Sequence, residues 1–346
     1  MNKPNIFDYA TSELSQDAFL IWLARWAKSK YSSSNNELHK TGKYFLNSLL
    51  QKKFGSDFKG YEEFDVIKIT PQIQKIDILI ELERKNVRLA IIIEDKVYSS
   101  EHSNQLEKYY KRVIELGYKK DEIIPIYFKT GFQHNLEKIR DKKYLIYSIN
   151  DFFDVLKNGK NAGIKNEIFI DYLEYIERVK KRYENDKLSF ENFRDSKIGR
   201  WNWWNWIGFF DKNAEVLNAK WGVVSNRREN LVAFWFGGAQ IKITHMEKEF
   251  TFHPYINITY SDRAKYLISY RLGLNGNTQK NKELRNIVIK EYIDIIQSRG
   301  IKVKIPRFKR AEETIELLKV SNVDENMDEN SLIEFLRIME NTIKEK

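Results

Sequence analysis

The segment 87–95 reads VRLAIIIED, an apolar run that ends directly in charged residues. A strand that is apolar on both faces must be covered on both faces. Side chains alternate along a strand, so Glu94 and Lys96 point to one face and Asp95 to the other. The segment therefore predicts a buried strand whose end carries either a solvated terminus or a functional site.

Two further strand-like runs, 63–70 and 75–83, precede this one, and short turns join all three. This spacing predicts an antiparallel meander. Downstream, a helical pattern ends at Gly117, and strand-like runs follow at 122–130 and 143–149. A strand, a crossover helix and another strand require at least partly parallel pairing. The predicted sheet is therefore mixed.

Amphipathic helices flank these strands. The stretch SQDAFLIWLARWAKS repeats apolar residues at helical spacing, with Ser15 as the expected N-cap. A second helix follows it, a helix capped by Asn150 or Asp151 comes after the last strand, and a long helix over 165–186 closes the unit. The predicted fold class is α/β (α+β), a mixed β-sheet flanked by helices.

The length of 346 residues exceeds the usual span of one domain. The chain changes character after a polar stretch near 186–196, where a densely aromatic segment is followed by new strand-like runs and helices. We predict an N-terminal domain over 1–190 and an α+β accessory domain of unassigned role over 191–346.

Composition limits the function classes. The 59 Lys and Arg against 49 Asp and Glu give a net charge of +10, which favours a nucleic-acid partner, although a Lys-rich surface also simply keeps a protein in solution. The chain has no cysteine, which excludes disulfides, thiolate zinc sites and cysteine nucleophiles. No run approaches the roughly 20 apolar residues of a membrane helix. The start of the chain lacks a signal-peptide pattern, so we expect a cytoplasmic protein.

Asp77 lies between two isoleucines in the preceding strand, where a carboxylate is costly unless it is paired or bound to a metal. Because the two strands are hairpin neighbours, Asp77 and Glu94 could face each other. Two adjacent carboxylates repel, and an all-oxygen ligand set suits Mg²⁺ or Mn²⁺. Lys96 beside them could orient or help deprotonate a water, or neutralise an attacked phosphate. This combination indicates phosphodiester hydrolysis.

A structural interpretation remains open. Glu94 and Lys96 would form an ion pair at the end of the strand, and Asp77 would cap a bend.

Asp77, a following strand that ends in EDK, and a helix that bears Gln105 and Tyr109 resemble the PD-(D/E)XK nuclease superfamily. The order of the predicted elements is similar to that superfamily's restriction-endonuclease-like core. The resemblance covers roughly 5–160 and is greatest to bacterial and phage-related members. One departure is Ile76, where the motif has proline, and the superfamily tolerates it.

The resemblance implies a role for each matched residue. Asp77 and Glu94 would bind the metal together with the main-chain oxygen of Asp95, and Lys96 would be the catalytic lysine. The implied cofactor is Mg²⁺, for which Mn²⁺ could substitute.

Two more positions match the superfamily less closely. Gln105 matches a helix glutamine that several nuclease branches place near the site. Glu13, just before the first predicted helix, matches an acidic position that sometimes completes the metal shell.

The implied activity is Mg²⁺-dependent hydrolysis of DNA, in restriction or phage defence. An RNA-cleaving nuclease and a non-catalytic nucleic-acid- or protein-binding module on the same fold remain alternatives. A homodimer or a partner protein is also open, because cutting both strands would require two sites.

The aromatic segment RWNWWNW permits two interpretations. Trp203, Trp206 and Phe210 have the spacing of a helix face packed into a core, which is the favoured prediction. Base stacking by Trp204, with phosphate contacts from Arg200 and Arg227–Arg228, is the alternative.

Overall fold

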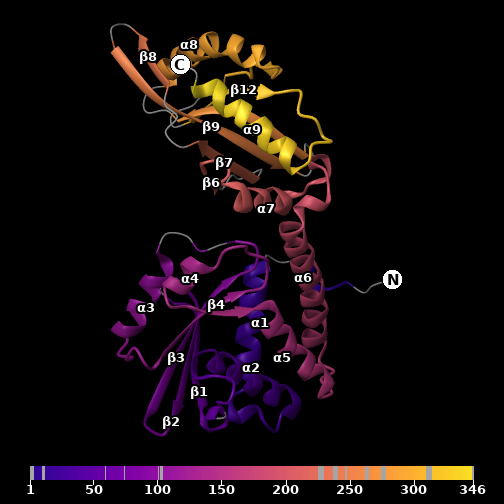
Figure 1. Cartoon of the computed structure of the whole chain (residues 1–346). Coiled ribbons are helices and arrows are strands. Elements are labelled where there is room, and N and C mark those ends of the chain that lie inside the picture. The colour runs from indigo at the N-terminus through magenta and orange to yellow at the C-terminus, as the bar shows by residue number, and fades with distance from the viewer. Residues whose placement is uncertain are drawn as a thin grey trace. The chain divides into compact units, whose positions relative to one another are not determined.

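The computed structural model forms two compact units, Met1–Lys187 and Leu188–Lys346 (Figure 1). The structure describes residues 4–9, 12–58, 60–73, 75–99, 101, 104–224, 230–236, 241–245, 248–261, 265–273, 278–308 and 314–344. No helix in these ranges is long and apolar enough to cross a membrane.

The first unit contains a five-stranded sheet in the order β1-β2-β3-β4-β5. Its strands are β1 (Asp65–Ile73), β2 (Ile76–Arg84), β3 (Val87–Lys96), β4 (Ile123–Lys129) and β5 (Leu145–Ser148). The first three strands pair antiparallel, whereas β4 pairs parallel with both β3 and β5. The predicted meander and the mixed sheet are confirmed, and β3 is the central strand.

Helices cover both faces of this sheet (Figure 1). One side carries α1 (Ser12–Trp26), α2 (Asn36–Phe54), α5 (Ile149–Asn161) and α6 (Glu167–Glu191), and the other side carries α3 (Gln105–Glu115) and the short α4 (Glu137–Asp141). Ile91 and Ile93 pack in the α1 core, and Ile92 packs beside Tyr109 of α3. The predicted alternation of β3 is confirmed, and both of its faces are buried.

Two predicted helix starts are wrong. Helix α1 begins at Ser12, so Ser15 lies inside its first turns. Helix α5 is capped by Ser148, whose hydroxyl accepts from the Asp151 main-chain N–H, while the Asp151 carboxylate accepts from the Ser148 N–H at 2.8 Å. This is a capping box, in which the acidic residue belongs at the third helical position and not at the cap. Neither Asn150 nor Asp151 is therefore the N-cap.

The predicted helix over 165–186 is longer in the structure. Helix α6 continues to Glu191, so its last residues lie in the second unit.

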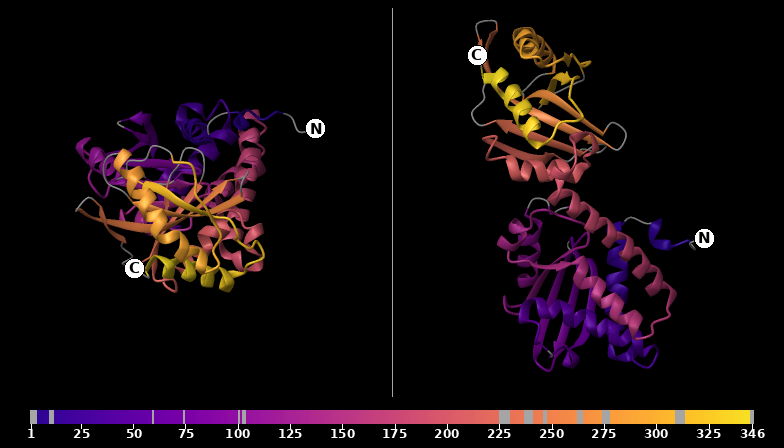
Figure 2. Two further views of the ribbon diagram at one scale, coloured as in Figure 1. Left: turned by 90° about the horizontal axis from the view of Figure 1, so that it is seen from above. Right: turned by 45° about the vertical axis from the view of Figure 1, so that its right-hand side comes forward.

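The second unit is built on an antiparallel sheet in the order β11-β12-β10-β9-β7-β6, and β8 pairs with β9. Its strands are β6 (Ala219–Val224), β7 (Asn230–Phe236), β8 (Ile241–His245), β9 (Lys248–Ser261), β10 (Lys265–Gly273), β11 (Val303–Lys304) and β12 (Thr314–Val320). Three helices, α7 (Trp203–Asn213), α8 (Thr278–Ser298) and α9 (Glu329–Lys344), share one apolar core with it. Figure 2 shows α9 (yellow) lying along the orange strands.

The aromatic segment supplies part of this second core. Trp206 and Phe210 are fully buried, and Trp203 is partly buried against the same core, so the predicted core face is confirmed. Trp204 is also partly packed on this core. Of the predicted phosphate contacts, Arg200 ends a short 3-10 helix, Ile198–Arg200, and Arg227–Arg228 lie outside the described residues.

Candidate active site

The two predicted carboxylates lie where β2 begins and β3 ends. In the antiparallel pairing of these strands, Ile78 lies opposite Ile93. Asp77 precedes Ile78 and Glu94 follows Ile93, so the register places the two acidic residues opposite each other. Both point to the face of the sheet that α3 covers, where Ile92 also packs.

The Lys96 ammonium lies among three oxygen atoms. Its Nζ is 2.6 Å from Glu94 Oε1 and 3.7 Å from Asp77 Oδ2. It also donates to the main-chain oxygen of Asp95 at 3.0 Å. A carboxylate from each of two neighbouring strands and one main-chain oxygen therefore converge on a single cationic centre.

Asp77 is oriented by the main chain of β3. The Asp95 N–H donates to Asp77 Oδ2 at 2.9 Å. Gln72 Nε2 makes longer contacts, at 3.5 Å from Asp77 Oδ1 and 3.4 Å from Asp17 Oδ2. The position of the Asp77 carboxylate thus depends on the register between β2 and β3.

Burial dominates the electrostatics of Glu94, of which 1% is exposed. Burial raises the pKa of Glu94 to about 7, with Asp77 adding to the shift and Lys96 opposing it. Burial also lowers the pKa of Lys96, but its ion pairs with Glu94 and Asp77 outweigh that effect, so the net shift is upward. The positive charge of Lys96 is therefore stabilised by the two carboxylates, and Lys96 in turn favours the ionised form of Glu94.

The donor set of this cluster fits a hard divalent cation. Glu94 Oε2 is buried and has no hydrogen-bond partner within the described ranges, an arrangement that is costly for a carboxylate. Oxygen ligands alone are what Mg²⁺ and Mn²⁺ prefer. Among the residues that the structure describes, no three His, Cys, Asp or Glu side chains group to hold a metal. A cation here would use two carboxylates, Asp77 and Glu94, and the Asp95 main-chain oxygen.

The Asp95 side chain lies on the opposite face of the sheet. Gln16 Nε2 of α1 donates to Asp95 Oδ1. Burial and the nearby Asp17 hold the pKa of the Asp95 carboxyl well above its usual range. Burial and Asp77 likewise raise the pKa of Asp17 to about 7. Only the main chain of Asp95 reaches the Lys96 cluster, while its side chain joins α1.

Sequence reasoning missed Gln16, which connects three elements. Its Oε1 accepts from Thr130 Oγ1 at 3.0 Å and from the Tyr172 hydroxyl at 3.4 Å, while its amide reaches Asp95. Gln16 is fully buried. The available signal was a polar residue beside the apolar stripe of the first predicted helix.

Glu13 lies in the first turn of α1, and not before the helix as predicted. Its Oε1 accepts from the Val97 N–H at 3.3 Å and from Ser99 Oγ at 2.6 Å. The three oxygens around Lys96 do not include Glu13. The structure thus places Glu13 on the segment that follows β3.

Gln105 is the first residue of α3 and is partly exposed. No hydrogen bond within the described ranges joins its side chain to the Lys96 cluster. Tyr109, one turn later, is buried against Ile92, and burial together with the charges of Glu94 and Asp77 raises the pKa of its hydroxyl. Tyr109 is thus the residue of this helix that lies beside the cluster.

Lys129 was also missed. It ends β4 in parallel register with Lys96, and 4% of it is exposed. Its Nζ donates to the main-chain oxygens of Val97 at 2.8 Å and Ser99 at 2.6 Å, and burial lowers its pKa to about 8. A lysine at the end of the buried strand IIPIYFK is the same signal that pointed to Lys96.

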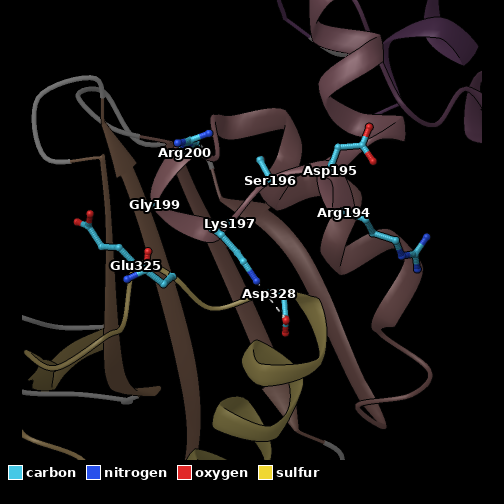
Figure 3. Close-up of a pocket in the computed structure, with 9 residues that line it drawn as sticks. Arg194, Asp195, Ser196, Lys197, Gly199, Arg200, Glu325 and Asp328 are labelled. Atoms are coloured by element: carbon cyan, nitrogen blue, oxygen red, sulfur yellow. Dashed lines mark hydrogen bonds and ion pairs between the residues drawn. The ribbon is translucent and has the colours of Figure 1, made fainter.

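A pocket of about 470 Å³ lies in the second unit, between 194–200 and 325–328 (Figure 3). Its charges are largely compensated, because Lys197 pairs with Asp328 at 3.3 Å and Arg194 pairs with Glu329. It contains no member of the Lys96 cluster, which is the stronger candidate for chemistry.

A family model described as the PD-(D/E)XK nuclease superfamily matches residues 4–207. This match covers more than half of the chain, which therefore belongs to the PD-(D/E)XK nuclease superfamily. Members of this superfamily are typically metal-dependent phosphodiesterases that act on nucleic acids. The resemblance in the sequence ends near residue 160, and the match of the family model extends beyond it into α7. No curated protein and no solved structure matches the chain.

Proposed function

We propose that the protein is a Mg²⁺-dependent nuclease that hydrolyses DNA phosphodiester bonds at the end of β3. The observation that supports this most directly is the convergence of Glu94 Oε1, the Asp95 main-chain oxygen and Asp77 Oδ2 on one cationic position, the Lys96 ammonium. Oxygens that can surround an ammonium ion at one point can also share a divalent cation. The proposed nuclease domain is 1–190, and 191–346 is the proposed accessory domain.

The proposed roles follow from the contacts. Asp77 and Glu94, with the Asp95 main-chain oxygen, hold the cation. A divalent cation held there supplies a Lewis acid for the phosphate and makes water more acidic. Lys96 orients the attacking water and neutralises charge that develops on the phosphate oxygens. The Asp95 N–H keeps Asp77 in place for this work.

The net charge of +10 supports a polyanionic substrate. Binding through phosphate contacts predicts that affinity falls steeply with salt, whichever sequence is bound. DNA rather than RNA, and a setting in restriction or phage defence, are proposed from the resemblance of residues 5–160 to nucleases of that kind.

The test is cleavage by the purified full chain. Supercoiled plasmid, linear DNA and a single-stranded RNA are incubated with Mg²⁺, Mn²⁺ or EDTA, beside the variants Asp77→Asn and Lys96→Ala. We expect metal-dependent cutting of DNA, with losses of at least ~100-fold in both variants, as is typical when a group that stabilises the transition state is removed. Lys68→Ala, at an exposed position of β1, is the matched control and should cut normally.

A second function is favoured by one observation. Lys96 already compensates Glu94 and Asp77, which is what a structural ion pair at the end of a strand would do. A protein that cuts no nucleic acid with any metal, and whose variants bind DNA as the native chain does, would be a non-catalytic binding module. Cleavage of RNA alone would change the substrate but keep the site.

A further inference from the structure

The segment Val97–Ser99 leaves β3 directly after Lys96, and β4 holds it in place. Lys129 Nζ donates to the Val97 oxygen at 2.8 Å and to the Ser99 oxygen at 2.6 Å. The Thr130 N–H donates to the Lys96 oxygen at 3.2 Å. The main-chain oxygens of Lys96, Val97 and Ser99 are thus all bound by residues at the end of β4.

The contact between the two segments is also steric. A Cβ atom added to Gly131 would lie 2.1 Å from the Val97 main-chain oxygen, closer than real Cβ contacts come. Only glycine at this position lets the exit of β3 lie directly against the end of β4. The packing therefore requires Gly131 as well as Lys129.

Helix α1 holds the same segment through Glu13. Its Oε1 accepts from the Val97 N–H and the Ser99 hydroxyl, whereas Lys129 binds the carbonyl oxygens of the same two residues. Glu13 and Lys129 also attract each other across this segment. The buried ammonium is thus offset by two carbonyl oxygens and a nearby carboxylate.

We infer that Lys129 is a positioning residue for the reaction at Lys96, an inference that rests on the proposed function. Its ammonium donates to the main chain just past Lys96, so it fixes where β3 ends and where the Lys96 side chain and the Asp95 carbonyl lie. A displacement of about 1 Å at reacting groups can cost ~100-fold in rate. Lys129 acts through this backbone and touches no substrate.

The test compares Lys129→Met with Lys53→Met, at a lysine of α2 whose ammonium binds the main chain at the other end of β4. Lys53 Nζ donates to the main-chain oxygens of Asp121 and Ile123, so Lys53→Met removes a similar backbone clamp away from the site. Amide hydrogen exchange of a peptide that covers 97–101 is measured without metal or substrate, and kcat and KM for cleavage are measured separately.

Lys129→Met should accelerate exchange over 97–99 at least ~10-fold and lower kcat ~10- to 100-fold with KM for DNA nearly unchanged. Lys129→Arg should recover part of both, because it keeps a cation on the carbonyls. Lys53→Met should change neither. Should Lys129→Met fail to fold, Gly131→Ala tests the same contact and should show the same exchange.

Two results would overturn the inference. One is unchanged exchange over 97–99 in Lys129→Met or Gly131→Ala. The other is an equal loss of kcat in Lys53→Met, which would make the effect one of general stability. Because exchange needs no activity, failure of the clamp and failure of the proposed nuclease function are told apart.

Discussion

The two faces of the sheet at the end of β3 both hold buried carboxylates, but they hold them differently. On the α3 side, Glu94 and Asp77 pair with a lysine, and the Asp77 side chain keeps 19% of its surface exposed. On the α1 side, Asp95 accepts from a fully buried Gln16 and is itself nearly inaccessible. The first face is open to solvent at Asp77, and the second is closed. Burial and charge alone therefore do not identify a catalytic carboxylate.

The largest expected effect is a loss of cleavage when the α3 side is changed. Glu94→Gln should lower metal-dependent cleavage by ~100- to 1,000-fold, because a charge at the reacting position is lost while the shape is kept. Circular dichroism should stay close to that of the native chain, because Lys96 keeps Asp77 and the Asp95 main-chain oxygen as partners. Cleavage rates on plasmid DNA measure the effect. A Glu94→Gln protein that cuts as fast as the native chain would remove this face from the chemistry.

The next effect is on stability and belongs to the α1 side. Gln16→Leu leaves Asp95, Thr130 and Tyr172 without their shared amide, so we expect unfolding free energy to fall by about 2–4 kcal/mol. Urea unfolding followed by tryptophan fluorescence measures it. A matched substitution on the surface of the same helix, Leu14→Gln, should change stability by less than about 0.5 kcal/mol. Equal losses in both variants would mean that the Gln16 contacts carry no special weight.

A metal bound on the α3 side should stabilise the folded chain, and this gain should not depend on the contacts on the α1 side. A cation at 100 times its dissociation constant adds about 2.7 kcal/mol to a fold that it binds. Mn²⁺ should therefore raise the thermal midpoint of the native chain and of Gln16→Leu by similar amounts, and it should not do so in Asp77→Asn. Differential scanning fluorimetry with and without EDTA gives the answer. A shift that persists in Asp77→Asn would place the cation elsewhere.

The smallest effect concerns Gln72. It makes long hydrogen bonds to Asp17 on the α1 side and to Asp77 on the α3 side. Gln72→Ala should cost less than about 1 kcal/mol and change kcat only a few-fold, because Gln72 is an exposed residue and its hydrogen bonds are long. Chemical unfolding and cleavage rates check both numbers. A loss as large as that of Glu94→Gln would show that the two faces act as one unit.

The strands were predictable because the physics behind them is local. The apolar run of β3 demands cover on both faces, and the two-residue period assigns Glu94 and Lys96 to one face and Asp95 to the other. The α5 cap was less predictable, since Ser148 and Asp151 are both residues that cap helices. Only their mutual hydrogen bonds show which one is the N-cap.

What could not be predicted depends on contacts between distant segments. The resemblance assigns Glu13 and Gln105 to the site, and only the path of α1 shows that Glu13 contacts the backbone of 97–99. Gln16 is inconspicuous in a sequence because periodicity marks apolar positions and not a polar residue among them. Lys129 did carry a signal, a charge at the end of a buried strand. The parallel pairing of β3 and β4, which places Lys129 beside Lys96, is needed to interpret it.

The contacts of Lys96 have a consequence for handling the protein. Many small metal-binding domains unfold when their metal is removed, because metal binding supplies much of their folding free energy. Here the chain's own ammonium pairs with Glu94 and Asp77, so the two carboxylates are not left unpaired when the metal is absent. We therefore expect the chain to stay folded in chelator, and the proposed function predicts that it is inert towards nucleic acid there and becomes active when a divalent cation is added.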